Sequence, residues 1–412
     1  MTVAARPDRE QRGTTMRRAV IVDVVRTPAG RGKPGGALSA CHPVELLRTV
    51  LSALVERTGI DPALIDDVIT GCVGQAKEQA VNIGRQGVLA SGWPDSVPAT
   101  TIDRQCGSSQ QAVHFAAQGI MAGSYDVAVA CGVESMSRVP IGAPTIGLDP
   151  YGERIHRRYA PGLVNQGVSA ELVARRWGFG REELDAYAAG SHRRAAAAAE
   201  RGGFADEIVP VTVRHPDGSE QMVRADETIR PGTTPEGLGA LRPSFATADM
   251  VERFPEIAWS ITPGNSSPLT DGASAALLVG EDTAARLGLS PRAAVHAMAL
   301  AGDDPILMLT APIPATRKVL ARAGLTLDDL DVYEVNEAFA PVPLAWRREL
   351  GADPDRLNPR GGAIALGHAL GASGTRLLGT MINYLEATGG RYGLQTMCEG
   401  GGMANATIVE RC

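Results

Sequence analysis

Lysine and long apolar runs are scarce in this 412-residue sequence. Lys33, Lys77 and Lys318 are the only lysines, so arginine carries nearly all the positive charge, and the net charge is −6. This acidic balance argues against a polyanion such as DNA as the main partner. No apolar run approaches the roughly 20 residues that span a bilayer. We therefore expect neither nucleic acid nor a membrane as a partner.

Cysteine is also sparse, with six residues in the chain and no Cys-x-x-Cys pair. Thiols this few argue against a disulfide framework, and no His/Cys spacing suits a metal ion. No glycine fingerprint for a nucleotide cofactor is present. We therefore expect a reducing, cytoplasmic location and neither metal nor cofactor. Residues 1–16 are rich in arginine but contain Asp8 and Glu10, which favours a disordered leader over a transit peptide, with Met16 as an alternative start.

The chain does contain a 44% apolar fraction and 48 glycines, which suit a globular enzyme. Strand-like and helix-like segments alternate from Arg18 onwards. The run AVIVDVVR predicts a buried strand, PVELLRTVLSALVERT predicts a helix that ends before Gly59, and IDDVITGCVG predicts another strand. This alternation is typical of βαβ units and predicts an α/β fold with a largely parallel sheet.

Two distant segments share one plan. Residues 103–133 and residues 366–401 each pass from a Gly/Ser-rich turn into a helix, and then through a Gly-containing turn into a strand that ends near a cysteine. The chain is therefore predicted to hold two related α/β halves.

The segment between these halves, residues 138–261, has a different composition. It is rich in Pro, Gly and Arg and has helical patterns of its own, such as REELDAYAAGSHRRAAAAAE. We expect an inserted loop domain that covers a site between the halves; the alternative is a structural excursion without ligand contact. The N-terminal half would then comprise residues 17–137 plus 262–288, and the C-terminal half residues 289–412.

The stretch DRQCGSSQQA contains a candidate nucleophile. Cys106 lies between a polar turn and a run with helical spacing that begins near Ser108. A thiol attacks as the thiolate, and its reference pKa of roughly 8.5 keeps it mostly protonated at neutral pH. The amides at the start of the following helix and a nearby histidine would favour the anion. A packing role is the alternative for Cys106.

Three other stretches supply further chemical groups. GGAIALGHALGASG places His368 among small residues, where the backbone can approach a ligand closely. MCEGGGMA places Cys398 before three glycines, whose amides suit an oxyanion hole. NEAFA puts Asn336 and Glu337 at the end of an apolar strand, where parallel sheets usually meet their ligands. A purely structural role is the alternative for His368 taken alone.

Together these motifs resemble the thiolase family, which comprises acetyl-CoA acetyltransferases and 3-ketoacyl-CoA thiolases. The nucleophile cysteine, NEAFA, GGAIALGHxxGASGxR and CxGGG occur in the family's order, and the resemblance covers about residues 17–411. It implies a thiolase fold, in which two related α/β halves form five layers, αβαβα, with an inserted loop domain. It also implies a homodimer or homotetramer.

The resemblance implies a role for individual residues. Cys106 would attack the keto carbonyl of a 3-ketoacyl-CoA and keep the shortened acyl group as a thioester. His368 would deprotonate Cys106 and, with a water held by Asn336, would stabilise the departing acetyl-CoA enolate. Cys398 would protonate that enolate and then deprotonate the incoming CoA thiol. The N–H groups of Cys106 and Gly400 would form the oxyanion hole.

Three further residues are candidates for contact with CoA or with the acyl group. Ser267, in ITPGNSSPLTDGASAALL, matches a family position that contacts the pantetheine arm. Gln166 stands where short-chain biosynthetic thiolases have methionine, which favours a longer or bulkier acyl group here. His156, beside two arginines, would meet CoA phosphates or else belong to a solvated basic turn.

Three positions depart from the family pattern. Ala369 replaces the proline that usually follows the catalytic histidine, Ser109 replaces a glycine of the nucleophile motif, and Ala404 replaces the glycine after the glycine triplet. Because alanine leaves the turn less rigid than proline does, we expect His368 to be held less firmly.

The sequence therefore predicts an acyltransferase that uses CoA to cleave 3-ketoacyl-CoA to acetyl-CoA, or propionyl-CoA, and a shortened acyl-CoA, in fatty acid or steroid side-chain β-oxidation. CoA and acyl-CoA thioesters would be its ligands, and a need for a hydratase/dehydrogenase partner is left open. One alternative is a biosynthetic acetyl-CoA acetyltransferase that forms acetoacetyl-CoA. Another is a thiolase-like acyl-CoA-binding protein without catalysis. A decarboxylating ketosynthase is disfavoured, because Cys398 stands where those enzymes have histidine or asparagine.

Overall fold

The computed structural model describes residues 17–215 and 217–412, so the predicted leader 1–16 lies outside the described residues. The strands are β1 (Ala19–Arg26), β2 (Gly30–Arg31), β3 (Asp67–Gly71), β4 (Ala99–Ile102), β5 (Val127–Ser135), β6 (Val211–Arg214), β7 (Glu220–Val223), β8 (Thr270–Gly280), β9 (Ala293–Gly302), β10 (Val332–Val335), β11 (Tyr392–Glu399) and β12 (Met403–Arg411). The helices are α1 (Pro43–Thr58), α2 (Ile83–Ala90), α3 (Ser108–Met121), α4 (Gly152–Arg158), α5 (Gln166–Trp177), α6 (Arg181–Glu200), α7 (Pro235–Gly239), α8 (Ala248–Arg253), α9 (Glu281–Leu287), α10 (Pro312–Ala323), α11 (Pro341–Leu350), α12 (Ala363–Leu366) and α13 (Ser373–Thr388).

One sheet runs through the molecule. In the described ranges its strand order is β10-β11-β12-β9-β1-β8-β5-β3-β4, with β2 beside β8. Strand β8 is antiparallel to β1 and β5, and β12 is antiparallel to β11 and β9. Strand β3 is parallel to β4 and β5, and β10 is parallel to β11. The prediction of a largely parallel sheet is therefore wrong. Local sequence patterns predict where strands occur but not their directions in the sheet. Strand β8 joins the sheet only after the whole 138–261 segment, and β12 returns directly from β11 through a glycine turn, so both are antiparallel to their neighbours.

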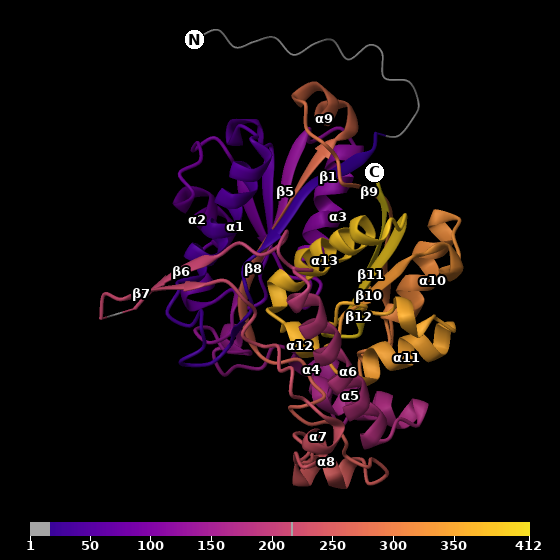
Figure 1. Ribbon diagram of the computed structural model, residues 1–412. Helices are drawn as coiled ribbons and strands as arrows, with labels where there is room; N and C mark the ends of the chain where they lie inside the picture. The colour runs from indigo at the N-terminus through magenta and orange to yellow at the C-terminus, as the bar shows by residue number, and fades with distance from the viewer. Residues whose placement is uncertain (1–16, 216) are drawn as a thin grey trace.

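The helices lie in three layers around the two halves of this sheet (Figure 1). Helices α3 and α13 pack between the halves, in a core that also contains residues of β1, β5, β8 and β12. Helices α1 and α2 cover the outer face of the N-terminal half, and α10 and α11 cover the outer face of the C-terminal half. The predicted five-layer αβαβα arrangement is confirmed.

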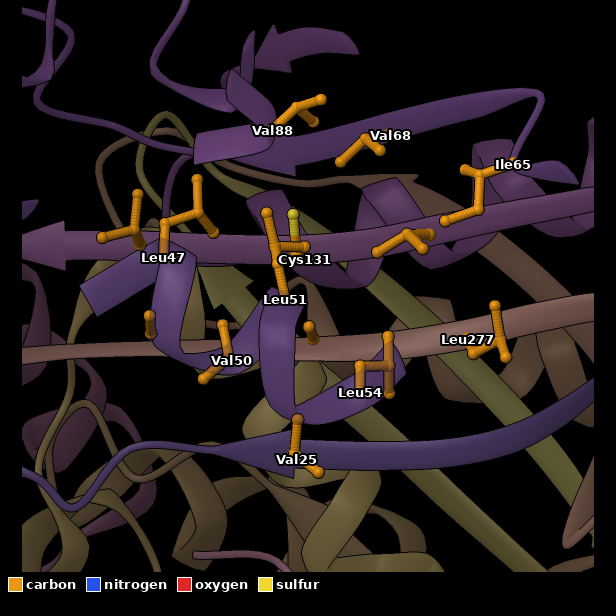
Figure 2. Close-up of a cluster of buried hydrophobic side chains, with 14 of the residues drawn as sticks. Val25, Leu47, Val50, Leu51, Leu54, Ile65, Val68, Val88, Cys131 and Leu277 are labelled. Carbon is orange, nitrogen blue, oxygen red and sulfur yellow. The ribbon is translucent and has the colours of Figure 1, made fainter. Parts of the chain in front are cut away.

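Helix α1 illustrates how the sequence forms the outer layer. Its N-terminus has Pro43 in the first turn, and Gly59, with φ of 68°, ends it as predicted. Its buried face, which includes Leu47, Leu51 and Leu54, packs on the sheet (Figure 2). Burying one such leucine contributes about 1.5–3 kcal/mol.

The segment 138–261 contains α4 to α8 and the β6–β7 hairpin, and its helices gather at one end of the molecule (Figure 1). Residues of α5 and α6 share a hydrophobic cluster with Phe339, Ile364 and Cys398. The loop segment is therefore packed against the chemically important stretches of the C-terminal half. None of the helices in the described ranges is long and apolar enough to cross a membrane.

Candidate active site

Cys106 lies in a tight turn between β4 and α3, and its side chain is buried. The hydroxyl of Ser108 holds this turn, because it donates to the carbonyl of Gln105 (2.6 Å) and accepts from the N–H of Arg104 (2.9 Å). Gln105 has a φ of 48°, a left-handed conformation that costs a non-glycine residue about 1–2 kcal/mol. Such strain persists only where the surroundings enforce it. Here it places Cys106 at the start of α3.

The surroundings of Cys106 keep its thiol protonated. Burial raises its pKa to about 12, and a negative charge on Glu399 contributes to the rise. The side-chain amide of Gln166, at the start of α5, forms a hydrogen bond that lowers this pKa. The partial positive charge at the N-terminus of α3 also favours the thiolate. Cys106 is thus a neutral thiol at neutral pH, and its use as a nucleophile requires a base.

His368 lies between α12 and α13, where its backbone N–H donates to Thr270 Oγ1 (2.9 Å). Burial lowers the pKa of its imidazole to about 3, and the charge of Arg376 adds to this effect. The ring is therefore neutral at neutral pH and able to accept a proton. Its Nδ1 lies 2.6 Å from Ser373 Oγ, and its Nε2 lies 3.4 Å from Asn336 Nδ2.

The hydrogen bonds of Ser373 determine the tautomer of His368. The Ser373 hydroxyl donates its proton to the carbonyl of Ala369 (2.8 Å), so its oxygen accepts from the imidazole. Nδ1 therefore carries the ring proton, and Nε2 has a lone pair. Asn336 faces that Nε2, while its own Oδ1 has no partner among the described residues. This is the arrangement of a general base.

Cys398, near the end of β11, is the second buried thiol of the site. Burial raises its pKa well above the ordinary value, and the nearby Cys106 contributes to the rise. The glycine turn after Cys398 lies against the Cys106 turn, since a Cβ on Gly400 would be 2.9 Å from Oε1 of Gln105. Gly401, with φ of 83°, allows the chain to reverse here, because glycine adopts positive φ without strain.

Neighbouring strand ends bring Asn336 close to the strand that carries Cys398. The N–H of Asn336 donates to the carbonyl of Thr396 (3.1 Å), on the strand that carries Cys398. One thiol at a helix start, a second thiol and a neutral histidine can together cleave a carbon–carbon bond: the bond needs a nucleophile for one carbon and a proton source for the other. In the described ranges no group of three or more His, Cys, Asp or Glu side chains is arranged to hold a metal ion.

Two domain models of one known family match almost the whole sequence of this chain. A model of the thiolase N-terminal domain matches residues 19–282, and a model of the thiolase C-terminal domain matches residues 289–411. The chain belongs to the thiolase family. Thiolases are acyltransferases, and this thiolase is therefore an enzyme of the predicted class.

Individual thiolases are similar over their full length. The steroid 3-ketoacyl-CoA thiolase FadA6 of Mycobacterium tuberculosis is 48% identical over 97% of this chain and 96% of its own. A 3-ketoacyl-CoA thiolase of Pseudoalteromonas translucida is 44% identical over 96% of this chain and 99% of its own. The crystal structure of the Bacillus anthracis acetyl-CoA acetyltransferase superposes with a TM-score of 0.85 at 35% identity, covering 97% of this chain and 100% of that one.

The structure shows the contacts made by two residues that depart from the thiolase pattern, Ser109 and Ala369. Ser109 is fully buried, and its hydroxyl accepts from the N–H of Thr375 (3.1 Å), so it joins the start of α3 to the start of α13. Ala369 has a φ of −72° and lines a cavity of about 20 Å³. The bonds that hold His368, from Thr270 and Ser373, do not involve the side chain of residue 369.

The three residues predicted to contact CoA or the acyl group lie in different places. Gln166 lies against Cys106. Ser267 donates both its N–H and its hydroxyl to the carbonyl of Ala338 (3.0 and 3.1 Å), which fixes it against the NEAFA motif. His156 lies on the exposed helix α4, where its Nε2 is 2.9 Å from Asp149 Oδ2. The structure thus brings Gln166 and Ser267 to the site's own segments, whereas His156 belongs to the solvated surface of the loop domain.

Two important residues of this thiolase were not singled out by sequence reasoning. Ser373 orients His368, and its signal is its position five residues later in the Gly-Ala-Ser-Gly turn. Glu337, which was noted only beside Asn336, is a buried anchor. Its carboxylate accepts hydrogen bonds from four groups: the hydroxyls of Tyr187 and Ser191, the side-chain amide of Asn358 and the N–H of Ile364. It thereby ties α6 of the loop domain to the site.

Proposed function

We propose that this thiolase is degradative and uses CoA to cleave a 3-ketoacyl-CoA into acetyl-CoA, or propionyl-CoA, and a shortened acyl-CoA. CoA is a substrate in this proposal, and no further cofactor takes part. The supporting observation is a pair of neighbouring buried thiols, together with a neutral His368 whose Nε2 has a lone pair and faces Asn336, because the Nδ1–H donates to Ser373 Oγ.

In the first half-reaction Cys106 becomes acylated. His368 Nε2 takes the thiol proton as the Cys106 sulfur attacks the keto carbon, and the N–H groups of Cys106 and Gly400 bind the resulting oxyanion. The bond between the keto carbon and the adjacent carbon then breaks, and its electron pair stays with the acetyl-CoA enolate. Asn336 and its water stabilise that enolate, and the Cys398 thiol protonates it.

In the second half-reaction the acyl group passes to CoA. The Cys398 thiolate takes the proton of the CoA thiol, whose sulfur attacks the Cys106 thioester. Cys106 leaves as a thiolate and regains its proton from His368. Both thiols and the imidazole thus return to the neutral forms that burial favours.

The acyl group is proposed to be bulky, of the steroid side-chain type. The similarity to FadA6 supports this choice, as does Gln166, a polar residue that α5 presents to Cys106. In this proposal the loop domain, residues 138–261, forms the acyl pocket. Ser267 contacts the pantetheine arm, and His156 contacts the CoA phosphates at the surface.

A second candidate function is biosynthetic acetyl-CoA acetyltransferase, which the similarity to the Bacillus anthracis enzyme favours. The two candidates differ in the acyl group that the pocket accepts. The deciding experiment measures CoA-dependent loss of acetoacetyl-CoA, a long-chain 3-ketoacyl-CoA and a steroid side-chain 3-ketoacyl-CoA, with Cys106→Ala as the control.

We expect kcat/KM to be highest for the steroid substrate and turnover to vanish in Cys106→Ala. Highest kcat/KM with acetoacetyl-CoA would select the biosynthetic function. If no substrate is cleaved while Cys106 still reacts with iodoacetamide, the result would favour an acyl-CoA-binding protein without catalysis or a substrate outside these three.

The enzyme is also proposed to be a cytoplasmic homodimer. Strand β4 ends the sheet on the N-terminal side in the described ranges, and Val81, before α2, is 83% exposed. A second copy that paired with β4 would continue the sheet and cover this apolar side chain. All six cysteines are free, which suits a reducing compartment. Light scattering of the purified protein distinguishes this dimer from a monomer or tetramer.

A further inference from the structure

Glu399 is a buried carboxyl group that the reaction above does not use. It ends β11, directly after Cys398, and its side chain is 0% exposed. Neither oxygen makes a hydrogen bond of normal geometry in the described part of the chain, although the N–H of Asn405 points towards the group. A buried carboxylate without partners is costly, so the neutral acid is the favoured form.

The Glu399 side chain lies against the turn that carries the nucleophile. A Cβ on Gly107, the residue after Cys106, would be only 2.1 Å from Glu399 Oε1. The carboxyl group thus occupies the space that a side chain at position 107 would need. Gly107 is also the N-cap of α3. A charge on Glu399 would compete with the Cys106 thiolate for the same helix N-terminus.

The charged groups that face Glu399 come from the turn before α3. Burial raises the pKa of Glu399 to about 8, Arg104 opposes this rise, and Asp103 adds to it. The Arg104 Nε is itself buried without a hydrogen-bond partner, so no hydrogen bond from it neutralises the carboxylate. Because the pKa is raised, Glu399 is neutral at pH 7 and becomes charged as the pH rises through about 8.

The influence of Glu399 reaches both thiols. After burial, its negative charge is the largest contribution that raises the pKa of Cys106, and it also raises the pKa of Cys398. Like charges this close disfavour each other's ionised forms. Deprotonating Glu399 therefore makes the thiolates that the reaction needs harder to form.

We propose that Glu399 is a positioning residue that acts through Cys106: its neutral carboxyl group permits the Cys106 thiolate, and its ionised form suppresses it. The consequence for turnover rests on the proposed function. The consequence for thiol reactivity does not, because alkylation of Cys106 requires no acyl substrate.

The test is the rate at which iodoacetamide alkylates Cys106 between pH 6 and pH 10, followed by mass spectrometry of the peptide that contains it. In Glu399→Gln we expect the rate to rise tenfold per pH unit throughout, because the thiol remains far below its pKa. In the parent protein the rise should flatten near pH 8, and the rate at pH 9.5 should lie about tenfold below that of the variant, equivalent to about one pKa unit.

Glu334→Gln is the matched control. Burial also raises the pKa of Glu334 to about 8, but the charged groups that face it are Arg376, Glu337, Glu207 and Arg360. Its alkylation profile should therefore flatten like that of the parent protein. Parallel profiles for the parent protein and Glu399→Gln would overturn the proposal. If Glu399→Gln fails to fold, Glu399→Ala provides the same comparison.

Steady-state turnover separates this proposal from the proposed function. If the enzyme is active, kcat/KM of the parent protein should fall above pH 8, and that of Glu399→Gln should not. A flattened alkylation profile in a protein that cleaves no 3-ketoacyl-CoA would support the role of Glu399 and overturn the proposed function. Turnover with parallel alkylation profiles would do the reverse.

Discussion

The turn that carries Cys106 and the turn that carries His368 are built alike, yet they prepare opposite partners of one proton transfer. Each leads into a helix whose first residue is serine, Ser108 for α3 and Ser373 for α13. Both hydrogen bonds of the Ser108 hydroxyl are made to its own backbone turn, whereas the Ser373 hydroxyl accepts a hydrogen bond from the imidazole Nδ1–H. A serine at the start of a helix thus stabilises a strained backbone turn in one half and the Nδ1–H tautomer of His368 in the other.

The strands that follow the two helices show the same divergence. Cys131 in β5 lies in the apolar cluster under α1 (Figure 2), where its sulfur is 3.1 Å from Thr70 Oγ1. Cys398 in β11 instead lies near Cys106. The cysteine at the corresponding place is therefore a core residue in one unit and a neighbour of Cys106 in the other, and contacts with distant segments make the difference.

The largest expected effect comes from replacing Cys398, and the same replacement at Cys131 is the matched comparison. Cys398→Ala should lower turnover by about 10²–10⁴, the usual worth of a positioned acid–base group. Acyl-Cys106 should still form and be detectable by mass spectrometry. Cys131→Ala should leave turnover intact and lower the free energy of unfolding in urea by about 1 kcal/mol, because it creates a small cavity. Equal losses of turnover in both variants would contradict the distinction between the halves.

Replacement of Ser373 should have a smaller effect. Ser373→Ala removes the acceptor that keeps the proton on Nδ1 of His368, so part of the protein will hold the tautomer whose Nε2 cannot accept a proton. We expect kcat to fall about tenfold, less than for loss of the base itself, while KM is unchanged. Steady-state kinetics measure both. A rise in KM alone would show that Ser373 supports substrate binding instead.

Ala369→Pro should have the smallest effect. The φ of −72° suits proline, and His368 before it lies in an extended β-bridge, as a residue before proline should. Because proline restricts the unfolded chain, the variant should gain about 0.4–1 kcal/mol in free energy of unfolding. Turnover should be unchanged. Denaturant titration measures the gain, and a loss of stability would show that the cavity beside residue 369 cannot take the ring.

Local sequence predicted those parts of the fold that local forces decide. The ends of α1 follow from Pro43 and Gly59, and β1 follows from its apolar run. The strand directions could not be predicted in this way, because β8 follows the loop segment in sequence whereas its partners β1 and β5 both precede it. Ordered motifs predicted that Cys106 and His368 act together, which stays a prediction. The relevance of Ser373 and Glu399 depends on contacts that form only in the folded chain.

The seam between α3 and α13 also has a bearing on how the protein is made. A Cβ on Gly374 would be 2.1 Å from the backbone nitrogen of Gln110, and Ser109 bonds Thr375 across the same seam. A ribosome releases the chain from its N-terminus, so Cys106 emerges long before His368 and Cys398. Cys106 is therefore without its proposed base, His368, for most of synthesis. We expect the incomplete chain to show no turnover until α13 and β11 have joined the fold.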